Sequence, residues 1–439
     1  MEIKIKKGFD IPIIGASSIF QGELSFPSRI GCDLSPFIMS KLALKVKVGD
    51  FVKAGDPIAE DKECPGRFFV SPAAGKVIQV HRGLKRRLLL VEIETAKNQE
   101  RKEFNQKELI SLLMESGLMT EIFARPGFRL ANPKKKPRSI FVNAVASAPF
   151  DPPFEMEIDC DPELFQEGLR ALSQIAPVHL VMKKGTESNA LKEAKEVSLH
   201  TIEGPHPIES VSLHIYHIDP IFDFDTTVWA LSPLTVLSLG MLLKKGRLKT
   251  SRFLSLAGEG VLEEKRGVYK GFAGQPISDL IDPISDGIRV ISGNPLTGQK
   301  IDAGGCLGIF ARCFSLIPEK NNREPLHFFR FGSQKFTATA TYLSHLLHKK
   351  LFSFTTNQHG EERAFIDPAI YDKAFSMKIP LVALMKALMA EDYERAIELG
   401  FLEVGVEDFS LPEFICPSKI PMTEIVKKSF IEFQRAYLP

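Results

Sequence analysis

Short apolar runs separated by tight-turn residues dominate the first 100 residues of the chain. The clearest examples are KVKVGDFVKAGDPIAE over residues 45–60 and FFVSPAAGKVIQVHRG over residues 68–83. Valine-rich runs alternate with Gly-Asp and Ala-Ala-Gly corners, and such corners are typical of tight turns between strands. The pattern therefore predicts a small β domain over residues 1–100.

Strand-like and helix-like patterns alternate over residues 101–250. Apolar residues recur with helical spacing in three segments, and apolar runs typical of buried strands lie among them. The expected helices cover residues 107–116, 162–175 and 187–196, and the expected strands cover residues 139–146, 178–185 and 197–202. This alternation predicts a Rossmann-like α/β domain with an open sheet.

The last two regions of the chain differ from each other in pattern. Residues 251–334 contain a strand and turn at 251–261, a short helix at 276–281 and a strand entering the Gly/Asn/Pro turn of 288–300, which suggests a β-grasp module. Residues 335–439 are mostly helical in pattern, which suggests a helical C-terminal domain. The chain is therefore expected to be a multidomain α/β protein, because 439 residues exceed what one hydrophobic core usually holds.

Residues 202–220 concentrate candidate chemistry. Three of the ten histidines, His206, His214 and His217, lie in this stretch. The imperfect alternation of apolar and polar residues over 211–218 predicts a strand that follows a Gly-Pro-x-Pro corner. If the chain carries redox chemistry, this corner is where a cofactor is expected.

The longest uncharged run, residues 226–243, predicts a buried helix. A membrane span is disfavoured because Pro233 interrupts the run and because serine, threonine and glycine dilute it. Ser232 is a suitable N-cap, Pro233 suits the first helical position and Gly246 suits the end of the helix. The N-terminus also lacks an apolar core long enough for a signal peptide.

Composition and motifs argue against several classes of function. The net charge of +2 gives no case for nucleic acid as a partner. The six cysteines include no Cys-x-x-Cys pair, which argues against a zinc ribbon or an iron–sulfur ligand run. His345 and His348 have i, i+3 spacing, but no third ligand is spaced to complete a metal site. The glycine-rich motifs that bind nucleotide phosphates are also missing.

The stretch RPGFRLANPKKKPRS, residues 125–139, is a basic loop punctuated by prolines. Its positive charges suit an acidic partner or phospholipid headgroups. A solvated surface loop explains the same composition equally well.

The turn pattern of residues 45–83 resembles the barrel-sandwich hybrid of biotinyl and lipoyl domains. In those carriers, a modified lysine lies at the tip of a hairpin between the two halves of the domain. Lys62 has a comparable place here, but the hairpin is short and Cys64-Pro65-Gly66 follows it. A solvated surface lysine is therefore the preferred interpretation, and a carrier function is the least favoured one.

Several stretches in the same order resemble the NqrA family of bacterial Na⁺-translocating NADH:quinone reductases. They are IKIKKGFDIPIIGA (3–16), GRFFVSPAAGKV (66–77), EGPHP (203–207), SGNPLTGQ (292–299), FTTNQHGEERAF (354–365) and FICPSK (414–419). The resemblance implies four domains over residues 1–100, 101–250, 251–334 and 335–439. It also implies a peripheral protein on the cytoplasmic face of the bacterial inner membrane, without a transmembrane helix, that docks on the other subunits of the complex and especially on the membrane protein NqrB.

The resemblance also implies how the chain takes part in electron transfer. The complex oxidises NADH, reduces ubiquinone to ubiquinol and exports Na⁺, using flavins and iron–sulfur centres in other subunits. The last three domains resemble the flavin subunit of respiratory complex I and the RnfC protein of the Rnf complex. Those relatives carry a glycine-rich flavin loop and clustered cysteines before a Cys-Pro pair. In this chain the loop is absent, and Cys416 has no second cysteine beside it, because the residue four positions earlier is Pro412. No catalytic site, flavin, iron–sulfur centre or metal is therefore expected in this chain.

Two alternatives to a cofactor-free docking role stay open beside the carrier. The chain could be a flavin- or quinone-binding redox component of an Rnf-type or complex I-type assembly. It could also contact ubiquinone within the Na⁺-translocating complex, with His206, His214 or His217 donating to a quinone oxygen and Phe150 or Trp229 stacking on the ring. The competing interpretation is a structural strand whose histidines make internal hydrogen bonds.

Overall fold

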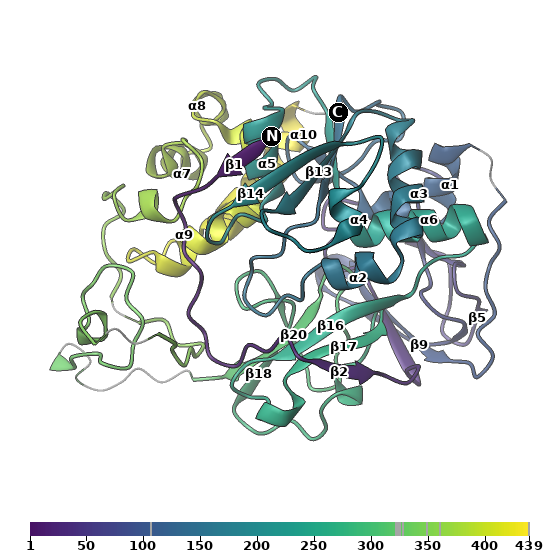
Figure 1. The fold of residues 1–439 in the computed structure, drawn as a ribbon, viewed down its shortest axis with the longest axis horizontal. Helices are drawn as coiled ribbons and strands as arrows, with labels where there is room; N and C mark the ends of the chain where they lie inside the picture. The colour runs from purple at the N-terminus through teal and green to yellow at the C-terminus, as the bar shows by residue number, and fades with distance from the viewer. Residues whose placement is uncertain (106–107, 321–325, 327–328, 348–349, 360, 438–439) are drawn as a thin grey trace.

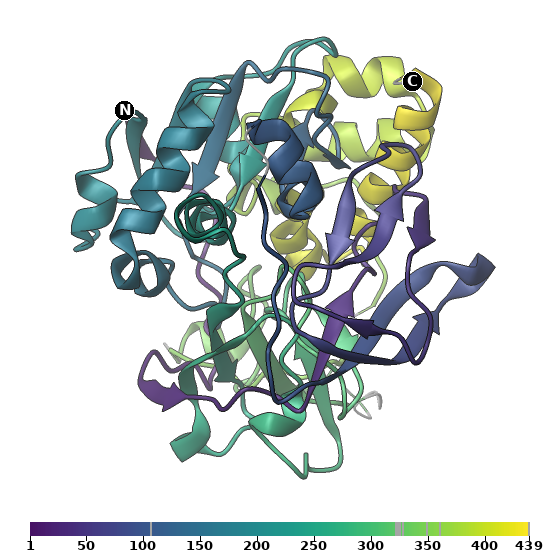
Figure 2. The ribbon, with the colours of Figure 1, turned by 90° about the vertical axis from the view of Figure 1, so that its right-hand side faces the viewer.

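Two large sheets and a small barrel contain the strands of the chain (Figures 1 and 2). The computed structural model describes residues 1–105, 108–320, 326, 329–347, 350–359 and 361–437. Within these ranges, none of the helices combines the length and the apolar character that crossing a bilayer requires.

The barrel consists of a four-stranded and a three-stranded antiparallel sheet. In spatial order, the first contains β3 (Arg29–Asp33), β9 (Leu88–Thr95), β8 (Gly75–Arg82) and β5 (Phe51–Val52), and the second contains β4 (Leu42–Leu44), β6 (Pro57–Asp61) and β7 (Phe68–Val70). Both predicted Gly-Asp corners are tight turns. The carboxylate of Asp50 accepts a hydrogen bond from the backbone N–H of Lys47 (2.7 Å), and that of Asp56 accepts one from Lys53 (2.8 Å).

A seven-stranded sheet with helices on both faces follows the barrel. Its spatial order is β1 (Glu2–Lys4), β14 (Ser198–Glu203), β13 (Val178–Lys183), β12 (Ser139–Asn143), β15 (Val228–Leu231), β10 (Phe123–Arg125) and β11 (Arg129–Leu130). The first five strands are parallel, and the last two run antiparallel to their neighbours. The helices are α1 (Leu109–Glu115), α2 (Glu155–Cys160), α3 (Pro162–Ser173), α4 (Asn189–Lys192), α5 (Val211–Ile218) and α6 (Pro233–Lys245).

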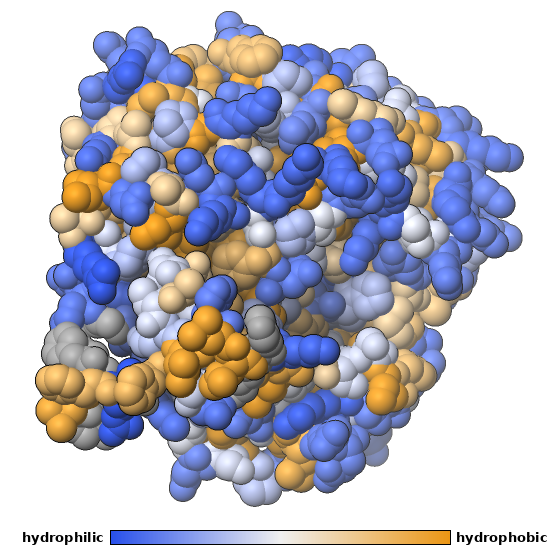
Figure 3. All heavy atoms as spheres, turned by 60° about the vertical axis from the view of Figure 1, so that its left-hand side comes forward, coloured by the Kyte–Doolittle hydropathy of each residue, from blue (hydrophilic) through white to orange (hydrophobic). Residues whose placement is uncertain are grey.

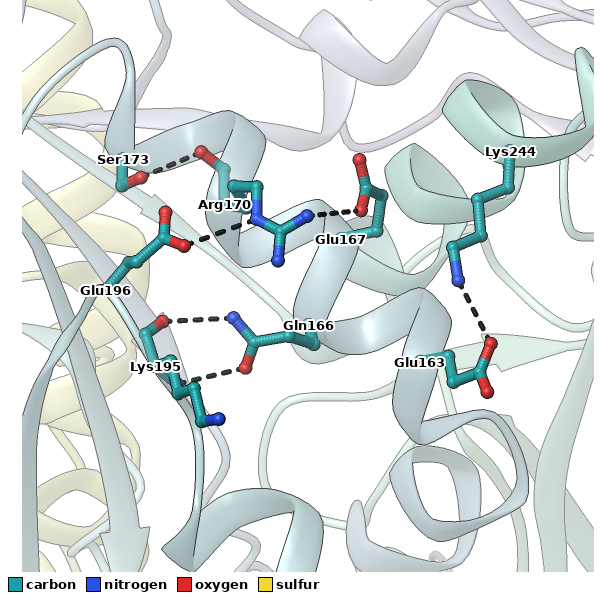
Figure 4. Close-up of polar contacts among 8 residues, drawn as sticks. All are labelled: Glu163, Gln166, Glu167, Arg170, Ser173, Lys195, Glu196 and Lys244. Atoms are coloured by element: carbon teal, nitrogen blue, oxygen red, sulfur yellow. Dashed lines mark hydrogen bonds and ion pairs between the residues drawn. The ribbon is translucent and has the colours of Figure 1, made fainter.

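Helices α3 and α6 pack against each other on one face of this sheet. Gly168 of α3 and Gly240 of α6 lie at the contact, where each approaches the backbone of the opposite helix. The outward face of α3 is polar: Arg170 pairs with Glu167 and Glu196, and Lys244 of α6 pairs with Glu163 (Figure 4). These pairs are exposed and contribute little to stability, so the apolar contact between the two helices carries the packing.

The caps predicted for the helix after residue 231 are confirmed, but the start of the uncharged run is a strand. The Ser232 hydroxyl accepts a hydrogen bond from the Thr235 backbone N–H, and Gly246 ends α6 in the left-handed region with φ of 62°. Residues 228–231 form β15 instead of helix, because four consecutive buried residues pair with β12 on one side and β10 on the other.

The predicted strand over residues 211–218 is wrong, because these residues form helix α5. Ser210 is the N-cap, and its hydroxyl accepts a hydrogen bond from the backbone N–H of Leu213. Four consecutive residues from Ser212 to Ile215 are buried, which an alternating half-buried strand would not show.

The second large sheet has six strands and includes a strand from the N-terminal segment. Its spatial order is β19 (Gln299–Ile301), β18 (Ile288–Ser292), β20 (Cys313–Pro318), β16 (Ser251–Ala257), β17 (Gly267–Phe272) and β2 (Phe20–Glu23). Strand β1 likewise pairs with β14 of the seven-stranded sheet. Both strands within the first 23 residues therefore pair with strands that lie outside the predicted 1–100 domain.

Four helices near the C-terminus cover the second face of the seven-stranded sheet (Figure 1). They are α7 (Leu381–Met389), α8 (Tyr393–Glu398), α9 (Ser410–Ile415) and α10 (Met422–Tyr437). Their apolar side chains share one core with Phe141, Val181 and Leu213. The described residues of 343–352 contain one 3₁₀ turn, Leu343–His345, and no α-helix, and His348 lies outside the described residues.

Candidate functional site

His206 lies at the carboxyl edge of the seven-stranded sheet, directly after β14. Its Nδ1 is 3.0 Å from the Ser147 hydroxyl, and its backbone N–H donates to the Asp10 carboxylate (2.9 Å). The residue is 4% exposed, and its Nε2 is buried without a hydrogen-bond partner. Burial lowers the pKa of His206 to about 4, so the ring is neutral near pH 7.

The other two candidate histidines lie on α5. His214 is fully buried, its Nε2 is 2.7 Å from the carbonyl oxygen of Ile208, and burial lowers its pKa to about 4. His217 is partly exposed, its Nε2 has no hydrogen-bond partner, and burial lowers its pKa as well. Neutral His214 is therefore a donor to the backbone carbonyl, which is a structural role.

The two aromatic candidates lie in different cores. Phe150 packs with Ile13, Ala257 and Ile291 against the six-stranded sheet, and its carbonyl oxygen accepts a hydrogen bond from the Ser255 hydroxyl. Trp229 is 1% exposed on β15, in the core that also holds α3 and α6. The core of α5 contains Val228, the residue before Trp229 on β15. Successive strand residues point to opposite faces of a sheet, so the core of α5 lies on the opposite face from Trp229. The structure therefore brings the loop of Phe150 to His206, through Ser147, but separates Trp229 from the α5 histidines.

A buried group of charges surrounds the loop of Phe150. The Glu209 carboxylate accepts hydrogen bonds from the backbone N–H groups of Ser147 (2.6 Å) and Ala148 (2.8 Å). Burial, together with the nearby Glu209 charge, raises the pKa of Asp151 to about 6. The guanidinium of Arg312 lies 3.5 Å from the ring centroid of Phe154 and attracts both carboxylates. These contacts join the two large sheets and hold the loop in place.

A pocket of about 100 Å³ lies elsewhere, where the barrel and both large sheets meet. Much of its lining is apolar, and the apolar residues come from all three units: Leu34, Phe69, Leu118, Leu234, Leu248 and Ile309. Hydroxyl groups line it as well, from Ser71, Ser116, Thr120, Ser238 and Thr250. None of the five sequence-predicted residues lines this pocket.

Charged side chains of the pocket are engaged with protein partners. Glu121 accepts a hydrogen bond from the Thr235 hydroxyl (2.8 Å), and burial raises its pKa. Arg252 donates to the carbonyl oxygen of Ile309 (2.9 Å), and the ammonium of Lys249 lies 3.5 Å from the Glu157 carboxylate. Ser71, Ser116 and Thr120 donate to backbone carbonyl oxygens as well. The hydroxyls of Ser238 and Thr250 are thus the pocket's adaptable hydrogen-bond donors.

The pocket lies beside helix α6, which begins at a switch in strand order. The chain moves from β12 through β13 to β14 in one direction, and β15 then lies on the other side of β12. Ligands of open α/β sheets bind at such switch points, outside the carboxyl ends of the strands. Applied to the sequence, this rule could have predicted a ligand site near Leu234 and Ser238. The other lining residues could not have been predicted in this way, because they are dispersed over the sequence.

The remaining sequence candidates are separate surface or core residues. Lys62 is exposed in the turn after β6, and Cys416 is buried with its Sγ 3.1 Å from the Tyr371 hydroxyl. All six cysteines are free. In the described ranges, no three His, Cys, Asp or Glu side chains are grouped to hold a metal ion.

The basic stretch after residue 124 is only partly solvated. Arg125 is 7% exposed, donates to the carbonyl oxygen of Gly127 (2.8 Å) and pairs with Glu407 near the C-terminus. Arg138 pairs with Asp219 (2.8 Å). Because β10 and β11 form a hairpin here, Arg125 points into the protein, whereas Lys134 and Lys136 are exposed.

The fold and its pockets define a multidomain α/β protein that combines a barrel-sandwich hybrid with a second α/β domain. Residues 3–96 match the family model of the NqrA N-terminal barrel-sandwich hybrid domain, and residues 104–248 match that of the NqrA second alpha/beta domain. The NqrA protein of the Na(+)-translocating NADH-quinone reductase from Chlamydia caviae is 36% identical, covering 99% of this chain and 97% of the relative. The corresponding protein from Tolumonas auensis is 30% identical, covering 98% of this chain and 99% of the relative. The chain therefore belongs to the NqrA family of the Na⁺-translocating NADH-quinone reductases.

Likenesses to solved structures are weaker. An NAD⁺-reducing [NiFe]-hydrogenase in the H₂-reduced state has a TM-score of 0.35 at 12% identity, covering 69% of this chain and 55% of the other. The air-oxidised form has a TM-score of 0.32 at 14% identity, covering 42% and 41%. These scores are too low to support a conclusion about fold or function.

Proposed function

We propose that the chain is the peripheral NqrA component of a Na⁺-translocating NADH:ubiquinone reductase and acts there by docking. The observation that carries this proposal is the near full-length similarity to relatives of that name. In this proposal, the complex oxidises NADH, reduces ubiquinone and exports Na⁺, with its flavins and iron–sulfur centres held by other subunits. The chain docks on the cytoplasmic face of the membrane, principally on the membrane protein NqrB.

We also propose the four-domain division expected from the sequence, at residues 1–100, 101–250, 251–334 and 335–439. The strand order of the parallel sheet supports a Rossmann-like second domain. The six-stranded sheet with a 3₁₀ turn at Ile277–Asp279 supports a β-grasp third domain, and helices α7 to α10 support a helical fourth domain.

An affinity-tagged copy of the chain, purified from its host after mild detergent extraction, tests the docking role. We expect the other subunits of the reductase to co-purify with it, together with Na⁺-dependent NADH:quinone reductase activity. Recovery of the tagged chain alone, from membranes that retain that activity, would contradict the proposal.

The chain purified by itself separates docking from the alternatives. We expect no flavin absorption band, no iron and an intact mass equal to that of the sequence. Stoichiometric flavin would favour a flavin-binding component of an Rnf-type or complex I-type assembly. A mass increment on Lys62 would favour a carrier.

Quinone contact is the second candidate function. The site that we favour for it is the pocket where the barrel and both large sheets meet, called the three-unit pocket below. A quinone headgroup is a flat, largely apolar ring with two carbonyl acceptors. Leu118 and Leu248 offer an apolar lining, and Ser238 and Thr250 offer donors. The volume of about 100 Å³ is small beside the ~300–1,000 Å³ of pockets for drug-sized ligands, so it suits a ring rather than a long side chain. The site around His206, His214, His217, Phe150 and Trp229 stays a prediction beside it.

Substitution Leu248→Trp is expected to reduce quinone photo-crosslinking to this chain by about tenfold or more, equivalent to about 1.4 kcal/mol. The indole would occupy the pocket, and Leu248 is partly exposed, so the substitution is compatible with folding. Labelling of the intact complex with a photoreactive quinone, followed by quantification on this chain, measures the effect.

Two further variants complete the comparison. Leu109→Trp, on α1 outside the pocket, is the matched control and is expected to label like the wild type. His206→Gln tests the histidine site. If His206→Gln abolishes labelling and Leu248→Trp does not, the histidine site is correct and the pocket is wrong. If neither variant changes the labelling, quinone contact at both sites is excluded.

A further inference from the structure

Residues 325–360 form a segment without acidic residues. The segment contains no Asp or Glu, whereas the chain as a whole has 54 acidic residues among 439. It contains four Lys or Arg residues: Arg330, Lys335, Lys349 and Lys350. The local charge is therefore positive, although the net charge of the whole chain is only +2.

The described part of this segment also exposes large apolar side chains. Phe331 is 80% exposed, Phe329 is 79% exposed and Leu346 is 69% exposed. Leu326, Leu347 and Leu351 are each more than half exposed as well. The described part of the segment lies between β20 and α7 and forms a lobe that stands out from the body of the molecule (Figure 1). Hydrophobic surface gathers in the same region of the space-filling view (Figure 3).

This cluster of exposed apolar side chains differs from the single exposed apolar residues that most protein surfaces carry. Single exposed residues, such as Leu84 at the tip of the barrel and Phe222, are common on soluble proteins. Six within residues 326–351 form an apolar surface that costs free energy in water, so a partner is expected to cover it.

The order of the residues indicates the chemistry of that partner. Arg330 lies between the two most exposed phenylalanines, and Lys350 precedes Leu351. Protein–protein interfaces are depleted of lysine, although arginine is enriched in them, whereas the bilayer interface accommodates aromatic rings together with both Lys and Arg. Lys350 beside Leu351 therefore favours a bilayer. The absence of carboxylates also suits negatively charged headgroups.

We propose that the lobe, defined by the described residues within 326–354, binds the surface of an anionic phospholipid bilayer. Its phenylalanine and leucine side chains insert at the boundary between headgroups and acyl chains, and its cations contact headgroup phosphates. The described residues of the lobe contain the 3₁₀ turn Leu343–His345, an isolated bridge of Phe352 to Ile13 and no α-helix, so the contact uses a protruding loop and not an amphipathic helix. This membrane contact is separate from docking on other subunits.

Flotation of the purified full chain with lipid vesicles tests the proposal. Binding is expected to vesicles of phosphatidylcholine and phosphatidylglycerol, to weaken at high salt, and to be at least tenfold weaker with pure phosphatidylcholine. The double variant Phe329→Ser, Phe331→Ser is expected to bind at least tenfold more weakly than the wild type. Lys350→Glu is expected to reduce binding severalfold and to leave less of the salt dependence.

Matched controls have the same chemistry at other exposed positions. Phe222→Ser removes a phenylalanine that is 76% exposed, and Lys97→Glu reverses an exposed lysine of the N-terminal region. Both are expected to bind like the wild type. If the double variant does not fold, the comparison of vesicle binding between Lys350→Glu and Lys97→Glu tests the proposal instead.

Three results would overturn the proposal. The first is equal binding of the wild type to both kinds of vesicle, or no binding at all. The second is an equal loss of binding in the lobe variants and in their controls. The third is flotation only with membranes that contain the other subunits of the reductase, which would identify the partner of the lobe as a protein. Co-purification of those subunits tests docking separately, so the two proposals fail in distinguishable ways.

Discussion

Substitution Gly240→Ala is expected to destabilise the α3–α6 layer by about 3 kcal/mol or more, as severe overpacking does. A Cβ atom at Gly240 would lie 1.9 Å from the carbonyl oxygen of Leu164, which is backbone and cannot move aside alone. The contact is reciprocal, because a Cβ atom at Gly168 would lie 2.1 Å from the carbonyl oxygen of Val236. Glycine to alanine inside a helix normally stabilises by roughly 0.5–1 kcal/mol, so the sign is reversed here.

Trp229 reports on this layer directly. It is the single tryptophan of the chain, it precedes α6 and it lies in the same core as both helices. Thermal unfolding followed by its fluorescence is expected to show an earlier transition in the Gly240→Ala variant. The matched control is Gly49→Ala, where φ is 100° and no atom lies within 4 Å of the added Cβ, so the cost is about 1 kcal/mol. Equal transitions in the two variants would show that the helices can separate without penalty.

His214 is expected to make folding stability depend on pH in the acid range. The folded protein holds the ring neutral, with a pKa lowered to about 4 by burial, whereas the unfolded chain protonates it near pH 6.5. The unfolded state therefore binds more protons, and stability falls as the pH decreases from about 6.5 towards 4. The full contribution of this one histidine is about 3 kcal/mol, from the difference of the two pKa values.

Denaturant unfolding of the wild type and of His214→Gln between pH 8 and pH 4 measures this contribution. The glutamine amide can donate to the Ile208 carbonyl but does not titrate, so the variant is expected to have a shallower pH dependence. His206 acts in the same direction as His214, and Asp408, whose pKa is raised to about 7 by burial, acts in the opposite one. Both are present in either protein, so they cancel in the difference. Exposed His345→Gln is the control, and a parallel pH dependence of His214→Gln and wild type would contradict the prediction.

Local signals predict the elements whose ends are marked in the sequence. Ser232, Pro233 and Gly246 bound α6 as expected, because a cap needs only its own neighbours. The strand prediction for residues 211–218 fails because the imperfect alternation of apolar and polar residues there is typical of strands but is compatible with a helix as well. Ser210 before this run is the available helix signal, and the packing of α5 against the C-terminal helices is not visible locally.

The candidate sites depend on information that no local pattern contains. His206, His214 and His217 are near each other in sequence, but whether they face a ligand or a carbonyl oxygen depends on the fold. Trp229 is close in sequence to α5 and yet lies on the other face of the sheet. The three-unit pocket combines residues from Gly31 to Ile309, so it exists only after the tertiary structure has formed.

The position of β1 and β2 has a consequence for synthesis on the ribosome. Residues 29–95 contain all the strands of the barrel, so this unit can close soon after it emerges. Strand β1 must wait for β14, some 200 residues later, and β2 must wait for β17, some 250 residues later. At ~5–20 residues per second, these two N-terminal strands stay unpaired for roughly 10–50 seconds. A nascent chain that pauses before residue 198 therefore presents both strands unpaired, and one that pauses between residues 203 and 267 still presents β2, so the N-terminal segment offers open strand edges that a chaperone would protect.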